Sequence, residues 1–192
     1  YRVDRGGRPT FDKVMRGWDI LKKFEVEANT LTVINRSNAK HPLQVYHFLK
    51  SIGSTFLQFI PIVERLPDSR LAGSIDLGGP PRPEDGPIRI PVTPWSVRPR
   101  EFGRFLISIF EEWVRKDVGT TYVQHFDSAL AKWAGAPGGL CTFSEECGNG
   151  LALERNGDLY SCDHYVYPEY NLGNINKDNL SSLANSPRQQ AF

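Results

Sequence analysis

The sequence predicts an α/β fold, in which a parallel sheet or barrel is followed by a small β-hairpin unit that carries all three cysteines. Three observations lead to this prediction. Helix-like and strand-like segments alternate in the first third of the chain, an apolar stripe with helical spacing runs through its middle, and an Asn-Gly pair lies among the cysteines near its end.

The first two elements follow from the spacing of apolar residues. In "TFDKVMRGWDILKKF", residues 10–24, apolar side chains recur every three or four positions, which predicts a helix with Thr10 as its N-cap. The next segment, "NTLTVIN" at 29–35, is short and rich in β-branched residues, which predicts a strand.

A second helix and a second strand follow directly. "PLQVYHFLKSIG", residues 42–53, has Pro42 where a first helical turn tolerates proline and Gly53 where a helix ends. "TFLQFIPIV", at 55–63, is largely apolar, as expected of a strand that helices cover on both faces. Helices and strands that alternate with short connections are typical of parallel sheets and barrels.

The middle of the chain changes character twice. Residues 65–100 contain eight prolines, so we expect a long loop with little regular structure there. From Phe102 to Val114 the apolar residues then form a stripe at helical spacing, which is the strongest helix prediction in the sequence.

A short strand over "TYVQHF" (121–126) and a helix over "DSALAKWAG" (127–135) complete the first part of the chain. The glycine-rich segment "GAPGGL" then predicts a hinge, and the composition changes at the first cysteine. We therefore expect two domains, residues 1–136 and residues 137–192.

Charge and cysteine content exclude several classes of protein. The chain has 23 Lys and Arg against 22 Asp and Glu, so a net charge of +1 gives no reason to expect binding to nucleic acid or to an anionic membrane surface. It contains no secretory signal and no apolar segment of the roughly 18 residues that a membrane span needs. An odd number of cysteines, three, favours a reducing cytoplasm. The start at Tyr1 and the end at "SPRQQAF" suggest a piece of a longer protein.

The Asn-Gly pair predicts how two of the cysteines approach each other. Asn156 and Gly157 suit the centre of a type I′ hairpin turn, because both tolerate the positive φ that this turn needs. In the matching register Leu151 pairs with Cys162. Cys162 then lies at the open end of the hairpin, beside the chain that follows Cys147.

Three interpretations of the three thiols are open at this point. Thiolates that converge on a hairpin suit an iron–sulfur cluster or a metal, which usually requires a fourth ligand. Zinc fits if His164 joins the three cysteines, although the usual zinc-site spacings are absent. Ordinary buried cysteines, with at most one disulfide, are the third interpretation.

The spacing of Cys147, Gly157 and Cys162 resembles the opening half of a SPASM domain, a unit that holds auxiliary 4Fe-4S clusters behind a radical S-adenosylmethionine (AdoMet) barrel. Further segments resemble the anaerobic sulfatase-maturating enzymes along essentially the whole chain. These segments are "YRVDRGGRPTFDKVMRG", "LTVINRSN", "LQFIPIVER", "FGRFLISIFEEWVRKDVG", "YVQHFDSALAKWAG" and, most specifically, "GDLYSCDHYVYPEYNLGNI".

The resemblance implies a partial (β/α) radical AdoMet barrel followed by the first part of a SPASM domain. By resemblance, Cys141, Cys147 and Cys162 are three ligands of the first auxiliary 4Fe-4S cluster, and the fourth ligand lies beyond Phe192. The C-x3-C-x2-C triad of the family and its later SPASM cysteines are absent. The isolated chain is therefore expected to be inactive, to hold no stable cluster, and to be metal-free or to bind zinc.

The resemblance also implies the reaction. The family oxidises a cysteine or serine of a sulfatase polypeptide to Cα-formylglycine, using AdoMet and an electron donor such as ferredoxin or flavodoxin. Asp163 matches the base that takes the substrate's proton, while Arg2 and Leu57 match contacts to the carboxylate and the adenine of AdoMet. On a strand, Asp163 is expected to leave the opposite face from Cys162.

Two other functions remain open from the sequence. One is a related SPASM-type radical AdoMet enzyme that modifies another peptide, and the other is a non-catalytic zinc-binding module.

Overall fold

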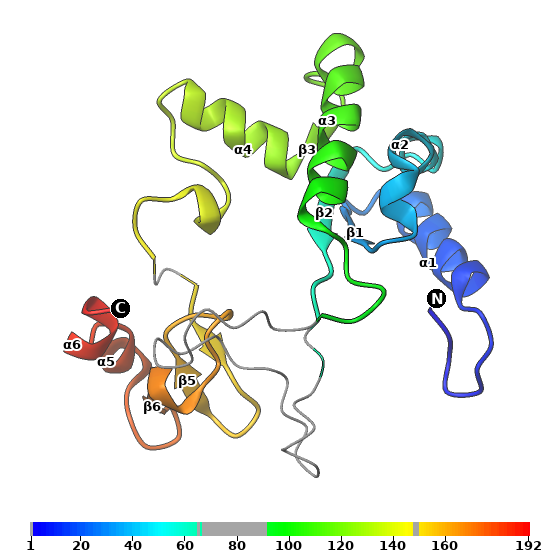
Figure 1. The fold of residues 1–192 in the computed structure, drawn as a ribbon. Coiled ribbons are helices and arrows are strands. Elements are labelled where there is room, and N and C mark those ends of the chain that lie inside the picture. The colour runs from blue at the N-terminus through cyan, green and yellow to red at the C-terminus, as the bar shows by residue number, and fades with distance from the viewer. Residues whose placement is uncertain (1, 65, 67–91, 148–149) are drawn as a thin grey trace.

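The computed structural model describes residues 2–64, 66, 92–147 and 150–192 (Figure 1). Most of the predicted proline-rich loop, residues 65 and 67–91, lies outside the described residues. The first part of the chain comprises α1 (Phe11–Lys23), β1 (Thr30–Ile34), η1 (Asn38–Lys40), α2 (Pro42–Ser51), β2 (Phe56–Pro61), α3 (Pro99–Lys116), β3 (Tyr122–Val123) and α4 (Gln124–Trp133). The second part comprises η4 (Cys141–Phe143), β4 (Ala152–Leu153), β5 (Asp158–Tyr160), η5 (Pro168–Tyr170), β6 (Asn171–Asn174), α5 (Leu180–Ala184) and α6 (Pro187–Gln190).

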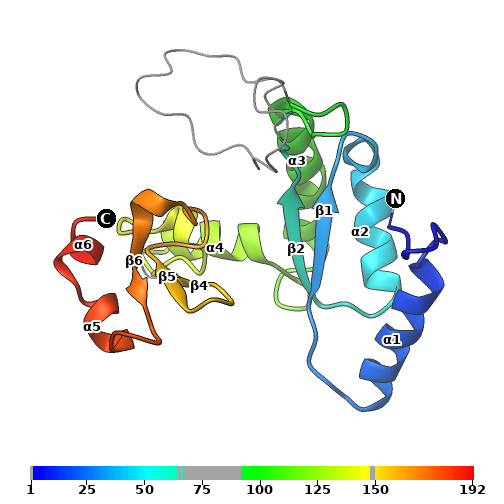
Figure 2. The same cartoon turned by 90° about the horizontal axis from the view of Figure 1, so that it is seen from below.

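The first three strands form the predicted parallel sheet, in the order β1-β2-β3. Thr30 of β1 pairs with Leu57 of β2, and Phe56 of β2 pairs with Tyr122 of β3. Between the strands the chain passes through α2 and then α3, because parallel neighbours need a crossover. Figure 2 shows α2 and α3 beside the β1–β2 pair. The prediction of an α/β fold is confirmed.

The core of this part lies between the sheet and its helices. Leu57 and Phe59 of β2 point into it and are almost fully buried. It also contains residues from β1, β3 and the three helices that follow β1, among them Ile34, Tyr46, Leu49, Phe105, Ile109, Trp113, Val123 and Phe126. Trp113 donates a hydrogen bond from Nε1 to the carbonyl oxygen of Thr121 at 2.7 Å, which fixes the turn before β3.

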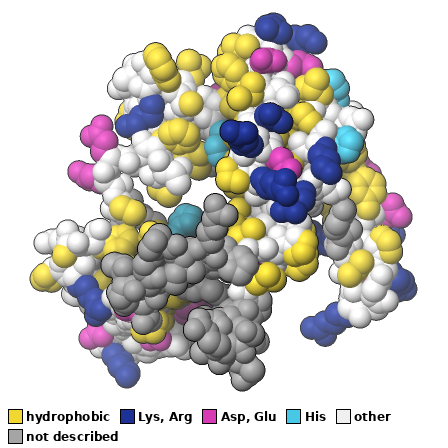
Figure 3. All heavy atoms as spheres, in the orientation of Figure 1, with side chains coloured by type: hydrophobic (Ala, Val, Ile, Leu, Met, Phe, Trp, Pro, Cys, Tyr) yellow, Lys and Arg dark blue, Asp and Glu magenta, His cyan; other side chains and the backbone are white. Residues whose placement is uncertain are grey.

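The opposite face of the sheet differs from the prediction, which had helices on both faces. Alternate residues of β2, Phe56 and Ile60, are 47% and 42% exposed. Phe56 stacks on Tyr122 with 4.9 Å between ring centroids. Figure 3 shows that hydrophobic side chains reach the surface over both parts of the chain. A largely apolar strand is consistent with cover on both faces, but its sequence does not show which segment covers the second face.

Helix α1 begins where it was predicted but is held differently. Thr10 occupies the N-cap position, yet its hydroxyl donates to the carbonyl oxygen of Arg2 at 3.2 Å and makes no capping bond. The helix has no buried residue. It docks on α2 through Trp18, whose Nε1 donates to the carbonyl oxygen of Ile52 at 2.8 Å.

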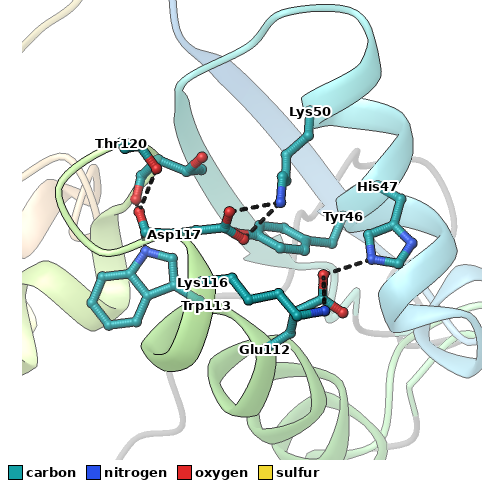
Figure 4. Close-up of polar contacts among 9 residues, drawn as sticks. Tyr46, His47, Lys50, Glu112, Trp113, Lys116, Asp117 and Thr120 are labelled. Atoms are coloured by element: carbon teal, nitrogen blue, oxygen red, sulfur yellow. Dashed lines mark hydrogen bonds and ion pairs between the residues drawn. The ribbon is translucent and has the colours of Figure 1, made fainter.

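A buried polar cluster ties α2 to the end of α3 (Figure 4). Tyr46 donates its hydroxyl proton to Oδ2 of Asp117 at 2.7 Å, and Nζ of Lys50 lies 2.7 Å from both carboxylate oxygens. On the neighbouring turn of the helices, Nε2 of His47 lies 2.8 Å from Oε1 of Glu112. These contacts hold the two helices together over the sheet.

Strand β3 is shorter than the sequence predicted. It contains Tyr122 and Val123 only, and residues 124–126 of the predicted strand already belong to α4. Residues 121–126 show no clear periodicity. Because residues 124–126 are helical, Phe126 can pack on Phe110 and Trp113. Packing, rather than local preference, sets the boundary.

The second part contains an antiparallel sheet in the order β4-β5-β6. Its hairpin was predicted, but the register is shifted by one residue, so that Leu153 pairs with Leu159. Gly157 has φ +91°, but Asn156 does not have a positive φ. Among the described residues, Glu25 is the one non-glycine residue that does. The turn is therefore not type I′. The carbonyl oxygen of Glu154 accepts from the amide of Gly157, and the amide of Glu154 donates to the carbonyl oxygen of Asp158, each at 2.9 Å. These two bonds close a loop that is longer than a two-residue hairpin turn.

Within the described residues, no helix has both the length and the apolar character needed to cross a membrane.

Candidate functional site

Three consecutive side chains that follow β5 converge on one point. Sγ of Cys162 lies 3.4 Å from Oδ1 of Asp163 and 3.7 Å from Nδ1 of His164, and the last two atoms are 3.0 Å apart. Across the part of the chain that the structure describes, these residues form the group of metal-binding side chains whose ligand atoms all lie within 4.8 Å of one another.

The backbone explains why neighbouring side chains meet. Strand β5 ends at Tyr160, before the cysteine. The amide of Asp163 donates to the carbonyl oxygen of Gly150 at 3.2 Å, and the amide of Tyr165 donates to that of Cys162 at 3.0 Å, which closes a tight turn. Side chains alternate between faces in a strand but not in a turn. The prediction that Asp163 and Cys162 leave opposite faces is therefore wrong.

The thiol of Cys162 is shielded from water, with 6% of the residue exposed. Burial, first of all, raises the pKa of this thiol, and the nearby Asp163 and Cys147 raise it further. The amide of His164 donates to Sγ at 3.4 Å and acts in the opposite direction. Asp163 and His164 are exposed, with side-chain fractions of 70% and 63%. The turn thus presents a buried sulfur beneath two solvent-facing groups.

The other two thiols are exposed. Cys147 is among the groups that raise the pKa of Cys162. It also lines a hollow of about 450 Å³, whose other lining residues are Ser161, Tyr165, Glu169, Tyr170, Arg188, Ala191 and Phe192. Cys141 lies in η4 and is not in the convergent group. The convergent group thus contains Cys162 but neither Cys147 nor Cys141, which are both free, exposed thiols.

The two residues matched to AdoMet contacts lie in the first part of the chain. Arg2 is exposed, and its carbonyl oxygen accepts from the amide of Thr10 at 3.2 Å. Leu57 is 1% exposed and packs in the core beside the helices. Its side chain therefore points away from the open face of the sheet, on which Phe56 lies.

A second hollow, which the sequence did not reveal, lies at the start of β2 and β3. Its volume is about 260 Å³, and it is lined by Asn29, Phe56, Leu57, Gln58, Tyr122, Gln124, Asp127 and Ser128. Oδ2 of Asp127 is buried and has no hydrogen-bond partner among the described residues. Burial raises the pKa of this carboxyl. In the sequence Asp127 is only the first residue of a predicted helix. The sequence could not reveal the burial of its carboxyl, because that burial depends on strand packing.

Comparison with known proteins shows similarity along the whole chain. Residues 141–192 match the family model SPASM, described as an iron-sulfur cluster-binding domain. The whole chain is 44% identical over 195 residues to a serine-type anaerobic sulfatase-maturating enzyme of Bacteroides thetaiotaomicron, of which it covers 45%. It is 30% identical over 188 residues to a cysteine-type enzyme of that name from Clostridium novyi, with 97% of this chain and 45% of the relative covered.

Solved structures agree with these sequence matches. The fold is similar to tagged anSMEcpe with bound AdoMet, with a TM-score of 0.75 and 26% identity over 98% of this chain and 45% of that one. Native anSMEcpe with bound AdoMet and a peptide gives a TM-score of 0.70 and 27% identity over 98% of this chain and 47% of that one. The chain thus spans a little under half the length of the relatives it matches.

Proposed function

The chain is related over its whole length to the anaerobic sulfatase-maturating enzymes, and from this relationship we propose that it forms part of a radical AdoMet enzyme that oxidises a cysteine or serine of a sulfatase polypeptide to Cα-formylglycine. The observation that supports this most is the 44% identity to the Bacteroides enzyme along 100% of this chain. It spans the barrel-like part and the cysteine-bearing part together, so the relationship does not rest on the SPASM unit alone.

The division of the chain follows from the same proposal. Residues 1–136 would supply later strands and helices of the barrel, and residues 137–192 the first part of the SPASM unit. The hinge segment between α4 and η4 supports this boundary, because α4 ends at Trp133 and the SPASM match begins at residue 141.

Cys141, Cys147 and Cys162 would hold an auxiliary 4Fe-4S cluster, with one further ligand from outside this chain. The donor set fits, because thiolates are the usual ligands of such clusters. Cys147 lines the same hollow as Ser161, the residue before Cys162, and this supports the fit. When bound, such a cluster supplies a place for the electron that leaves the substrate.

Asp163 would accept the proton from the thiol or hydroxyl of the substrate. It is the solvent-facing carboxylate of the convergent group, so an incoming peptide can reach it without rearrangement of the turn. An exposed carboxylate is a weak base in water, and substrate binding must exclude water for it to act efficiently.

Arg2 and Leu57 remain the proposed contacts to AdoMet. A guanidinium suits the carboxylate of this cofactor, because it is a fixed planar donor. Leu57 lines the second hollow, which supports its proposed apolar contact to the adenine, although only 1% of the residue is exposed. Ferredoxin or flavodoxin as electron donor, and a cytoplasmic location, belong to the same proposal.

The test uses the full-length protein that contains this chain, purified and reconstituted without oxygen. Incubation with AdoMet, a reductant and a sulfatase peptide should give 5′-deoxyadenosine and an aldehyde at the target residue, detected by mass spectrometry after hydrazine labelling. Parallel peptides with serine and with cysteine at the target position identify the substrate type. AdoMet cleavage without peptide oxidation would point to another peptide-modifying enzyme, and the 192-residue chain alone should give no 5′-deoxyadenosine.

A further inference from the structure

We propose that Cys162, Asp163 and His164 form a ready-made site for one borderline divalent cation, Zn²⁺ in the first place, which is occupied only while Cys162 carries no cluster. This site differs from a set of three thiols and a histidine. It uses a single thiolate and is built by three consecutive residues of one turn.

The distances between the three ligand atoms are close to those that a zinc ion requires. Zinc lies at 2.0–2.3 Å from nitrogen, oxygen and sulfur ligands, so tetrahedral ligand atoms are separated by about 3.3–3.6 Å. The observed separations are 3.4 Å from Sγ of Cys162 to Oδ1 of Asp163, 3.7 Å from Sγ to Nδ1 of His164, and 3.0 Å from Oδ1 to Nδ1. One ion can therefore touch all three atoms after shifts of a few tenths of an ångström.

The backbone holds this arrangement in place without a metal. The turn is closed by the bond from Tyr165 N to the carbonyl oxygen of Cys162, and it is tied to the hairpin through Gly150. The amide of His164 donates to Sγ at 3.4 Å, a contact that suits a metal-bound thiolate as well as a free one. A preformed site loses little conformational entropy when the ion binds.

The donor set selects the type of metal. One sulfur, one imidazole nitrogen and one carboxylate oxygen suit Zn²⁺ and similar borderline ions, whereas Mg²⁺ and Ca²⁺ prefer all-oxygen sites. Asp163 and His164 are exposed, so an ion can enter from solvent and keep water as its fourth ligand. Binding replaces the thiol proton of Cys162, which is released to solvent.

Occupation of the turn by zinc would affect assembly of the iron–sulfur cluster. Cys162 cannot serve a mononuclear ion and an iron–sulfur cluster at the same time, so zinc at this turn would exclude cluster formation. This second step rests on the proposed function, whereas zinc binding by the turn does not.

The first experiment measures zinc binding by the metal-free, reduced chain of 192 residues, by competition with a chromophoric chelator. We expect one high-affinity Zn²⁺ per chain. His164→Ala and Asp163→Ala should each lower the affinity by about 10–100-fold or more, since even outer contacts of metal ligands have effects of this size. His41→Ala, at an exposed histidine of the first part of the chain, is the matched control, and its affinity should equal that of the unmodified chain. Substitution with Co²⁺ should give the absorption of a tetrahedral site with one thiolate.

Two outcomes would overturn the site. The first is binding that survives His164→Ala but is lost in Cys141→Ser, which would indicate a thiol-only set. The second is the absence of stoichiometric binding.

For the second step, one equivalent of Zn²⁺ added to the full-length apoprotein should lower the iron incorporated on reconstitution, and His164→Ala should restore it. If zinc leaves iron incorporation unchanged, zinc at the turn does not exclude the cluster. The chelator experiment still tests zinc binding by the turn, and the maturase assay still tests the proposed function.

Discussion

The thiol of Cys162 and the carboxylate of Asp163 lie on the same side of the chain, with Sγ and Oδ1 3.4 Å apart. A proposed cluster ligand and a proposed base therefore share one small volume. Their roles are nevertheless separable by substitution, because only the sulfur is buried and only the carboxylate faces solvent.

Asp163→Asn in the full-length enzyme should abolish the base while keeping the size of the side chain. We expect formylglycine formation to fall by roughly 10²–10⁴-fold, the usual effect of losing a general base. Iron content and AdoMet binding should stay near normal. Cys162→Ala should instead lower the iron content first. An Asn variant that matures peptide at the original rate, with chemistry shown to limit that rate, would rule out Asp163 as the base.

Asp117→Asn should destabilise the barrel part of the chain. It removes the charge that Lys50 and Tyr46 contact, and leaves the Lys50 ammonium half-buried without its partner. The expected loss is about 1–3 kcal/mol, less than for a fully buried pair because the Lys50 side chain is partly exposed. Urea unfolding measures it. Lys13→Ala, which removes an exposed ion pair with Asp4, is the control and should leave the midpoint unchanged.

The same contacts predict a dependence on pH. Burial by itself would raise the pKa of Asp117, but hydrogen bonds from Lys50 and Tyr46 outweigh it, so the pKa lies below the ordinary 3.8. A lowered carboxyl pKa stabilises the fold above the unfolded-state value, and this contribution is lost as the pH falls through the folded-state value. The stability difference between the unmodified chain and Asp117→Asn should therefore be full at neutral pH and shrink below about pH 4. A difference that stays constant down to about pH 2 would contradict this origin.

Two glycines should respond in opposite directions to alanine. Gly157 has φ +91°, and an added Cβ would collide with the amide side chain of Asn176, so Gly157→Ala should destabilise the hairpin by more than about 1 kcal/mol. Gly103 lies inside α3, where an added methyl group would meet no atom within 4 Å apart from its chain neighbours and the backbone of its own helix. Gly103→Ala should therefore stabilise the chain by about 0.5–1 kcal/mol. Thermal unfolding of both variants checks this, and equal effects would show that hairpin strain is not the cause.

Elements with strong local signals were predictable from the sequence. Helix α2 begins at Pro42 and is followed by Gly53 with φ +80°, as the sequence indicated. Helix α3 runs from Pro99 to Lys116 over the apolar stripe. The boundary between β3 and α4 was not predictable, because two strand residues gain their place only by pairing with Phe56 and Leu57.

By itself, the sequence determined the α/β class, the hairpin near the cysteines and the family resemblance, because these depend on periodicity, turn residues and spacing along the chain. The tertiary structure alone decided which side chains meet. The hairpin register moved by one residue because Gly157, and not Asn156, takes positive φ, and the chain then turned at Cys162 instead of extending. That turn brings Asp163 and His164 to the same sulfur, a relationship that alternation along a strand would have forbidden.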